Sequence, residues 1–125
     1  MKLAITTTEA PAALGPYSQA VVTGNFLFCA GQIPLDPATG EIVPGDITAQ
    51  TTRALDNLAA VLRANQMTFE DVIKTTVFMT NLGDFAAMNT VYATYFKAPY
   101  PARSTVQVVA LPKGVQVEIE AIASR

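Results

Sequence analysis

The sequence has 125 residues, is 50% hydrophobic and carries a net charge of −2, which is enough chain for one domain, residues 1–125, with a single core. Its eight basic residues are scattered singly, so no basic stripe can neutralise phosphates, and nucleic-acid binding is not expected. The absence of histidine excludes Ser–His and Cys–His nucleophile pairs and histidine-based metal sites, so any catalysis must depend on carboxylate, arginine, hydroxyl, backbone and water.

The first third of the chain predicts a turn, a hairpin and a long loop. Residues 15–19, Gly-Pro-Tyr-Ser-Gln, are typical of a turn that enters a strand. Gly24-Asn25 then separates the apolar runs 20–22 and 26–30, which is the pattern of a β-hairpin. Prolines and glycines recur among polar residues between positions 34 and 45 and indicate a long loop.

Two amphipathic helices are predicted, one on each side of a buried strand. Asp46 offers an N-cap for the first helix, from about 47 to 64, which ends before Asn65, a residue that tolerates the left-handed conformation. Residues 71–80 are rich in Val, Ile, Thr and Phe and predict the strand. Asp84 is expected to cap the second helix, whose apolar stripe consists of Phe85, Met88, Tyr92 and Phe96.

The last two strand-like segments carry the most informative charges. Arg103 lies on the first, and Glu118 and Glu120 share one face of the second, opposite its apolar positions. Because the two segments are neighbours, we expect the arginine to reach toward a glutamate. A guanidinium holds a carboxylate bidentately, so this pair would suit a small 2-oxo or 2-imino acid. The alternatives are a surface ion pair for Arg103 and a solvated strand face for the glutamates.

Together these elements predict an α+β domain in which a mixed sheet is covered on one face by two helices. Only 14% of the residues are charged, against about 25% in a typical globular domain, so self-association is expected. Cys29 is the single cysteine and lies in an apolar run, which indicates a buried thiol and fits a cytoplasmic setting. No apolar run approaches the roughly 20 residues of a membrane span, so no membrane partner is expected.

Three other positions have both a structural and a functional interpretation. Tyr17 either packs at a strand start or lines a cleft with its hydroxyl. Gly31 provides either a positive φ angle or room for a ligand to approach the backbone. Asn89 lies beside the apolar stripe of the second helix, where a solvated or interface amide is the default.

Several motifs in a fixed order connect these positions: Gly15-Pro16-Tyr17-Ser18-Gln19-Ala20, Gly31-Gln32-Ile33-Pro34, Lys74-Thr75-Thr76-Val77-Phe78, Asp84-Phe85 with Asn89, Pro101-Ala102-Arg103-Ser104, and Ile119-Glu120-Ala121-Ile122-Ala123. With them the sequence resembles the RidA/YjgF family of reactive intermediate deaminases over essentially its whole length. The resemblance implies a chorismate-mutase-like α+β fold and a homotrimer with sites in the clefts between subunits. It also implies cofactor-free hydrolysis of enamine and imine acids, such as 2-aminoacrylate and 2-iminobutanoate, to the 2-oxo acid and ammonia.

The resemblance further implies a role for each candidate residue. Arg103 would hold the substrate carboxylate, and Glu120 would position the attacking water. The pocket would be completed by the backbone carbonyl of Thr105, the backbone of Gly31, and the side chains of Tyr17 and Asn89. No metal is implied, and no role is implied for Glu118.

Two departures and two alternative functions accompany this interpretation. Many family members carry serine or threonine where this chain has Cys29-Ala30, which affects the preferred substrate more than the reaction. Val109 is bulkier than the small residue expected there, which is a packing variation.

One alternative function is a non-catalytic trimeric binder or sensor of small 2-oxo acids. The other, a ribonuclease or translation inhibitor, is disfavoured by the acidic balance and the lack of histidine.

Overall fold

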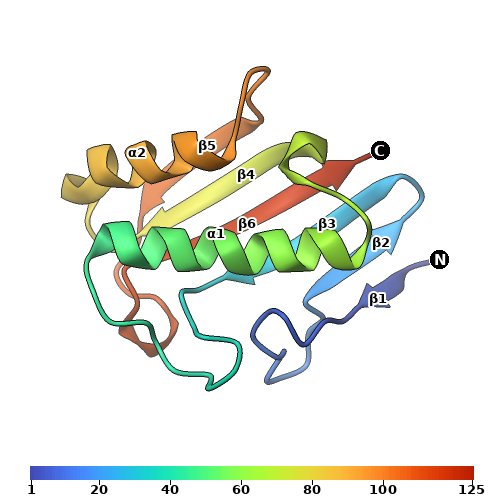
Figure 1. The fold of residues 1–125 in the computed structure, drawn as a ribbon, viewed down its shortest axis with the longest axis horizontal. Coiled ribbons are helices and arrows are strands. Elements are labelled where there is room, and N and C mark those ends of the chain that lie inside the picture. The colour runs from blue at the N-terminus through green and yellow to red at the C-terminus, as the bar shows by residue number, and fades with distance from the viewer.

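The computed structural model describes residues 1–125 as a six-stranded sheet with two α-helices (Figure 1). The elements in chain order are β1 (Leu3–Ile5), β2 (Ala20–Thr23), β3 (Phe26–Gln32), α1 (Ile47–Ala64), β4 (Val72–Met79), α2 (Phe85–Tyr95), β5 (Ala102–Gln107) and β6 (Val117–Ser124). Short 3₁₀ turns precede β4, α2 and β6: Phe69–Asp71, Leu82–Asp84 and Pro112–Gly114. From β2 onward the order of elements is the predicted one, whereas β1 was not predicted, and the α+β class with a mixed sheet is confirmed.

The sheet order explains why both helices cover the same face. The strands run β1-β2-β3-β6-β4-β5, and only the β4–β5 pair is parallel. The chain crosses from β3 through α1 to β4, and from β4 through α2 to β5, so both crossovers step in the same direction along the sheet. Because such crossovers are right-handed, both helices come to lie on one face, as Figure 1 shows. The other face carries no helix and is called the open face below.

The expectation that the two charged segments form neighbouring strands is wrong, because β4 lies between β5 and β6. The β4–α2–β5 crossover places β5 on the outer edge of β4, and β6 inserts antiparallel on the inner edge. In this register Thr75 of β4 pairs with Arg103 on one side and with Ala121 on the other. Arg103 and Glu120 are therefore two strands apart.

Helix α1 begins and ends close to where the sequence predicts. The carboxylate of Asp46 accepts a hydrogen bond from the backbone N–H of Ala49 at 3.1 Å, which satisfies one free donor of the first turn. The buried face of the helix includes Leu55, Leu58, Val61 and Leu62, all fully buried against the sheet. Asn65 does not take the left-handed conformation, since its φ is −110°; Gln66 takes it instead, with φ of 58°. Neither helix combines the length and hydropathy needed to cross a membrane.

Helix α2 differs from its predicted form at the first turn. Asp84 occupies the N-cap position, but its side chain makes no capping hydrogen bond. The preceding 3₁₀ turn is capped instead by Asn81, whose side chain accepts from the N–H of Gly83 at 2.8 Å. Met88, Tyr92 and Phe96 are buried as predicted, whereas Phe85 remains 38% exposed. The partly exposed Phe85 side chain, at the start of α2, borders the candidate site.

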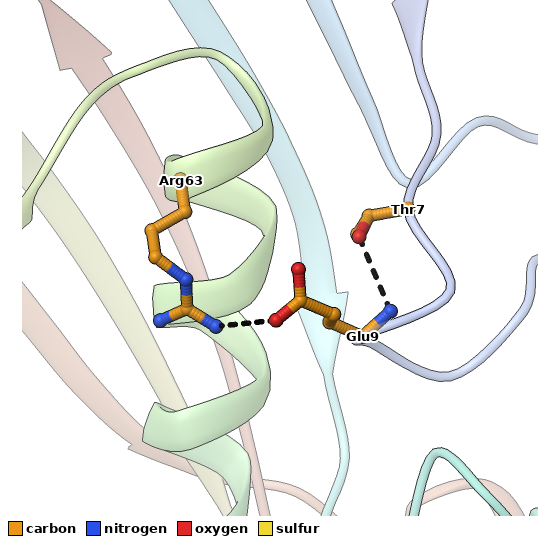
Figure 2. Close-up of polar contacts among 3 residues, drawn as sticks. All are labelled: Thr7, Glu9 and Arg63. Carbon is orange, nitrogen blue, oxygen red and sulfur yellow. Dashed lines mark hydrogen bonds and ion pairs between the residues drawn. The ribbon is translucent and has the colours of Figure 1, made fainter.

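The segment between β1 and β2 is attached to the domain through one buried amide and through the side chain of Ala10, which is packed in the core. The Gln19 side chain accepts from the N–H of Thr7 at 2.7 Å and donates to the carbonyls of Thr7 and Pro11 at 3.0 and 2.8 Å. Glu9 of the same segment pairs with Arg63 of α1 at 3.3 Å, and its own N–H donates to the Thr7 hydroxyl (Figure 2). Both charged side chains of that ion pair are mostly exposed, so it contributes little to stability.

The open face of the sheet exposes aromatic and aliphatic side chains. Phe26 and Phe28 of β3 stack on each other and are 43% and 42% exposed. Val106 of β5, which pairs with Phe78 of β4, is exposed to a similar extent. Monomeric proteins seldom expose apolar side chains gathered on one face, so this face is suited to covering by another surface.

Candidate active site

Arg103 lies on the helix-covered face of β5, against the aromatic side chains of α2. Its guanidinium carbon is 4.7 Å from the centre of the Tyr92 ring and 5.5 Å from that of Phe85. Both distances are within the range of a cation–π contact, which contributes about 0.5–2 kcal/mol. Helical spacing explains the arrangement, since residues 85 and 92 are seven apart and share one face of α2. The half-exposed Phe85 thereby forms one wall beside the arginine.

Tyr92 is itself fixed in place beneath the guanidinium. Its hydroxyl lies 2.8 Å from the hydroxyl of Thr75 on β4, in a buried hydrogen bond. Burial raises the pKa of Tyr92, an effect partly opposed by the Thr75 hydrogen bond and the nearby Arg103 charge. The phenol therefore stays neutral, and its ring provides a fixed surface for the arginine.

The Arg103 guanidinium has no acidic partner within the chain. The structure contains a single ion pair, between Arg63 and Glu9, and Arg103 makes no side-chain hydrogen bond. The predicted alternative of a surface ion pair is therefore wrong for the single chain. Hence all the guanidinium donors are available to an anionic ligand.

A pocket of about 360 Å³ opens beside this arginine; it is lined by Asn89, Tyr92, Ala93, Tyr100, Pro101 and Arg103. Two predicted site residues, Asn89 and Arg103, thus lie together. Thr105 lies two residues beyond Arg103 on the same face of β5, and its buried hydroxyl has no hydrogen-bond partner. This pocket offers a fixed cation, an amide and a phenol at its rim, which suits a small carboxylate.

Glu120 lies on the other side of the sheet. It pairs across the strands with Thr76 of β4, which in turn pairs with Ser104 of β5, and this row of side chains is on the open face. The next residue, Ala121, pairs with Thr75 and is buried beneath the helices on the Arg103 side. Within one chain the sheet therefore separates the arginine from the glutamate. The expectation that Arg103 reaches toward Glu120 in the same chain is wrong, because their strands present these residues to opposite faces.

Gly31 is required by a neighbouring side chain. Its φ is not positive, so that explanation for the glycine is wrong. A Cβ at position 31 would overlap the carboxylate of Glu118 and lie 2.7 Å from its carboxyl carbon. The ladder between β3 and β6 is irregular between Cys29 and Gln32, which brings the Gly31 backbone under that side chain. Glu118, which has no role from the sequence, is therefore packed directly on a predicted pocket residue.

Glu118 and Glu120 occupy different environments on the same strand. Glu118 is half-buried between Gly31 and Phe78 of β4, whereas Glu120 is exposed beside Thr76. Burial, followed by repulsion from Glu120, raises the pKa of Glu118 above its ordinary value. Glu118 therefore holds its proton more readily than an ordinary glutamate.

The remaining candidates lie elsewhere. Tyr17 is 56% exposed and lines a hollow of about 450 Å³ together with residues 6–8 of the N-terminal segment. Burial raises the pKa of Cys29 to about 12, so the predicted buried thiol is confirmed and stays protonated. No group of three or more histidine, cysteine, aspartate or glutamate side chains gathers at a point where a metal could bind.

Sequence reasoning missed two residues of the Arg103 pocket. Tyr92 is predicted as part of the apolar stripe, yet the face of its ring lies beneath the Arg103 guanidinium. Tyr100 is 63% exposed at the pocket rim, just before the motif that contains Arg103. A usable signal was the helical spacing of Phe85, Asn89 and Tyr92, which places an amide among aromatic residues on one face.

Comparison with known proteins shows to which family the chain belongs. The model of the family described as Endoribonuclease L-PSP matches residues 7–125. The chain belongs to this family, also known as RidA/YjgF. A RutC family protein of Pyrococcus horikoshii is 57% identical over 98% of both chains. The mouse protein named 2-iminobutanoate/2-iminopropanoate deaminase is 49% identical over 95% of this chain and 88% of its own.

Solved structures of RidA/YjgF proteins have the same fold. RidA from an Antarctic Psychrobacter species superposes with a TM-score of 0.95 at 45% identity, over 98% of this chain and 99% of its own. TdcF of Escherichia coli, determined with bound serine, gives a TM-score of 0.94 at 49% identity, over 98% of both chains. Homologues named as imine deaminases indicate enzymatic activity in the family.

Proposed function

We propose that this RidA/YjgF protein is a 2-iminobutanoate/2-iminopropanoate deaminase. It would hydrolyse reactive enamine and imine acids, such as 2-aminoacrylate, to 2-oxo acids and ammonia. The observation that carries the proposal is the Arg103 guanidinium, held over the Tyr92 ring beside a pocket and without any partner in the chain. The mammalian relatives with this activity in their names, at 47–49% identity, support the substrate class.

The site offers few chemical groups, and these are enough for this reaction. Imines of this type hydrolyse in water unaided, so a modest lowering of the barrier suffices, each tenfold acceleration requiring about 1.4 kcal/mol. Arg103 would neutralise and orient the carboxylate next to the C=N carbon, and Glu120 would position the attacking water. Asn89, Thr105, Tyr17 and the Gly31 backbone would complete the pocket. Neither a cofactor nor a metal takes part in these steps.

The proposed site requires more than one copy of the chain. Arg103 and Glu120 lie on opposite faces of one sheet, so a second copy must bring its Glu120 face to the Arg103 pocket. We propose the homotrimer implied by the family resemblance, with each site between two subunits. The exposed Phe26 and Phe28 on the open face support an assembly that covers this face. Light scattering coupled to size exclusion tests the trimer by measuring its mass.

A coupled assay tests the activity. A threonine dehydratase generates 2-iminobutanoate, and a trapping amine reports how long the imine persists. We expect the protein to shorten that lifetime and Arg103→Ala to remove the effect. If wild-type protein leaves the imine lifetime unchanged, or if Arg103→Ala performs equally well, the deaminase assignment fails. Saturable binding of a 2-oxo acid without turnover would then favour the alternative, a non-catalytic sensor.

The proposal also states the cell compartment in which the protein acts and that it does not bind RNA. The single buried cysteine fits the cytoplasm, where thiols stay reduced. We do not extend the endoribonuclease description of the family to this chain, because its net charge is −2 and it has no histidine. Binding of RNA at low salt, lost steeply as salt rises, would contradict this part of the proposal.

A further inference from the structure

Two carboxyl groups with different environments project from the same side of β6. Glu118 and Glu120 are two residues apart on one strand, so their Cα atoms are about 6.7 Å apart and their side chains point the same way. Glu118 lies on the Gly31 backbone, with the apolar Phe78 as its cross-strand neighbour. Glu120 is exposed and has the hydroxyl of Thr76 as its neighbour.

We propose that Glu118 is a second catalytic carboxyl group, which donates a proton to the imine nitrogen while Glu120 accepts one from the attacking water. This inference rests on the proposed deaminase function and deepens it. The position of Glu118 carries the argument, because its carboxyl group lies against Gly31, whose backbone is a proposed wall of the substrate pocket. A half-buried carboxyl group in contact with this proposed wall is suited to bring a proton to the substrate.

Within one chain the surroundings of Glu118 shift its pKa toward the protonated form. On β6 its charged neighbour is Glu120, and β3 has no charged residue. On β4 the charged residue of the open face is Lys74, whose ammonium group donates to the Ser104 hydroxyl and forms no ion pair with either glutamate. Burial and the repulsion from Glu120 raise the pKa of Glu118. A carboxyl group whose environment raises its pKa is suited to act as a general acid.

Together the two carboxyl groups can carry out the reaction with no net change in their protonation states. In the first step Glu120 takes a proton from water, the water oxygen bonds to the imine carbon, and the Glu118 proton moves to the nitrogen. This gives a carbinolamine, a protonated Glu120 and an ionised Glu118. In the second step Glu118 takes the hydroxyl proton, Glu120 protonates the nitrogen, and the C–N bond breaks to release ammonia and the 2-oxo acid. Both glutamates are then restored to their starting states.

The pH dependence of Glu118→Gln in the coupled assay tests this role. The amide preserves the shape of the side chain but cannot transfer a proton. We expect a loss of about a hundredfold in kcat/KM, at the lower end for general acid catalysis. Wild-type activity should fall as pH rises through the raised pKa of Glu118, because the donor is then ionised, and Glu118→Gln should lack this descending limb. Glu118→Asp, which keeps an ionisable acid, should retain the limb at a reduced rate.

The controls separate this inference from the proposed function. Glu70→Gln changes an exposed carboxylate before the opposite end of β4 and should behave as wild type. Circular dichroism and size exclusion verify that each variant folds and assembles. If wild type is active and Glu118→Gln keeps its rate, or keeps the descending limb, Glu118 is not the donor. If Glu118→Gln does not assemble, the Glu118→Asp variant decides the question. An assembled Glu118→Asp variant whose activity no longer falls as pH rises would show that Glu118 is not the proton donor. If wild type itself does not shorten the imine lifetime, the deaminase function is what fails.

Discussion

Two inactive variants of this protein should restore activity when they assemble together. Arg103→Ala removes the proposed carboxylate anchor, and Glu120→Gln removes the proposed base. In one chain these residues lie on opposite faces of the sheet, separated by the register Arg103–Thr75–Ala121. A site between subunits therefore takes its arginine from one copy and its glutamate from the next.

The expected recovery follows from counting the subunit contacts. In a cyclic trimer each contact is heterologous, so one given copy provides the arginine and the other the glutamate. When the two variants are co-expressed in equal amounts and mix at random, each contact receives an intact arginine half the time and an intact glutamate half the time. About one quarter of the sites are then intact, so activity should recover to about one quarter of wild type.

The imine-lifetime assay measures this recovery directly. Each variant alone should fall to the rate without enzyme, and the co-expressed mixture should reach the calculated fraction. The matched control is the double variant, Arg103→Ala with Glu120→Gln, co-expressed with wild type, because half of the chains then carry both changes and intact contacts again number about one quarter. An inactive mixture of the single variants, beside an active control, would refute a site shared between subunits.

Three other expectations follow from the described contacts. Gly31→Ala should lower kcat/KM in the imine assay by up to about the hundredfold expected for Glu118→Gln, because the new methyl group displaces the Glu118 carboxyl. Tyr92→Leu should raise KM far more than it lowers kcat, since it removes the ring beneath Arg103, whereas Tyr92→Phe, which keeps the ring, should stay within a fewfold of wild type in steady-state kinetics. Asp46→Ala should lower the free energy of unfolding in urea by about 1 kcal/mol, because α1 loses its N-cap, without changing activity.

Each of these expectations has an outcome that contradicts it. A Gly31→Ala variant with an unchanged kcat/KM would mean that Glu118 moves aside at no cost to the reaction. A Tyr92→Leu variant with an unchanged KM would show that the cation–π contact does not hold the arginine for its substrate. Equal urea midpoints for wild type and Asp46→Ala would mean that water satisfies the first turn of α1 equally well.

Local signals predicted the elements of this fold but not their arrangement. Helix α1 has an N-cap at Asp46 and leucines at helical spacing, so sequence neighbours decide where it begins and ends. The position of β6 depends on pairing with β3 and β4, which lie far away in the sequence. Long-range pairing leaves no local pattern, which is why β5 and β6 were expected side by side.

The candidate site was predictable in composition but not in geometry. The faces of Arg103 and Glu120 follow from the strand period, but the face that the helices cover depends on the crossovers. Gly31 illustrates the same limit, because the side chain that excludes a Cβ comes from a strand more than 80 residues later.

The attachment of the N-terminal segment through Gln19 has a consequence for dynamics. Between Thr7 and Pro11 the segment has no strand partner, and one amide side chain supplies its buried hydrogen bonds. The exposed Glu9–Arg63 pair adds little restraint. Local opening of such a unit requires the Gln19 contacts to break and the small Ala10 side chain to leave the core, while the sheet stays folded. We therefore expect the amide protons of this segment to exchange as a unit of their own, faster than those of the core strands, and Tyr17, near its end, to move with it.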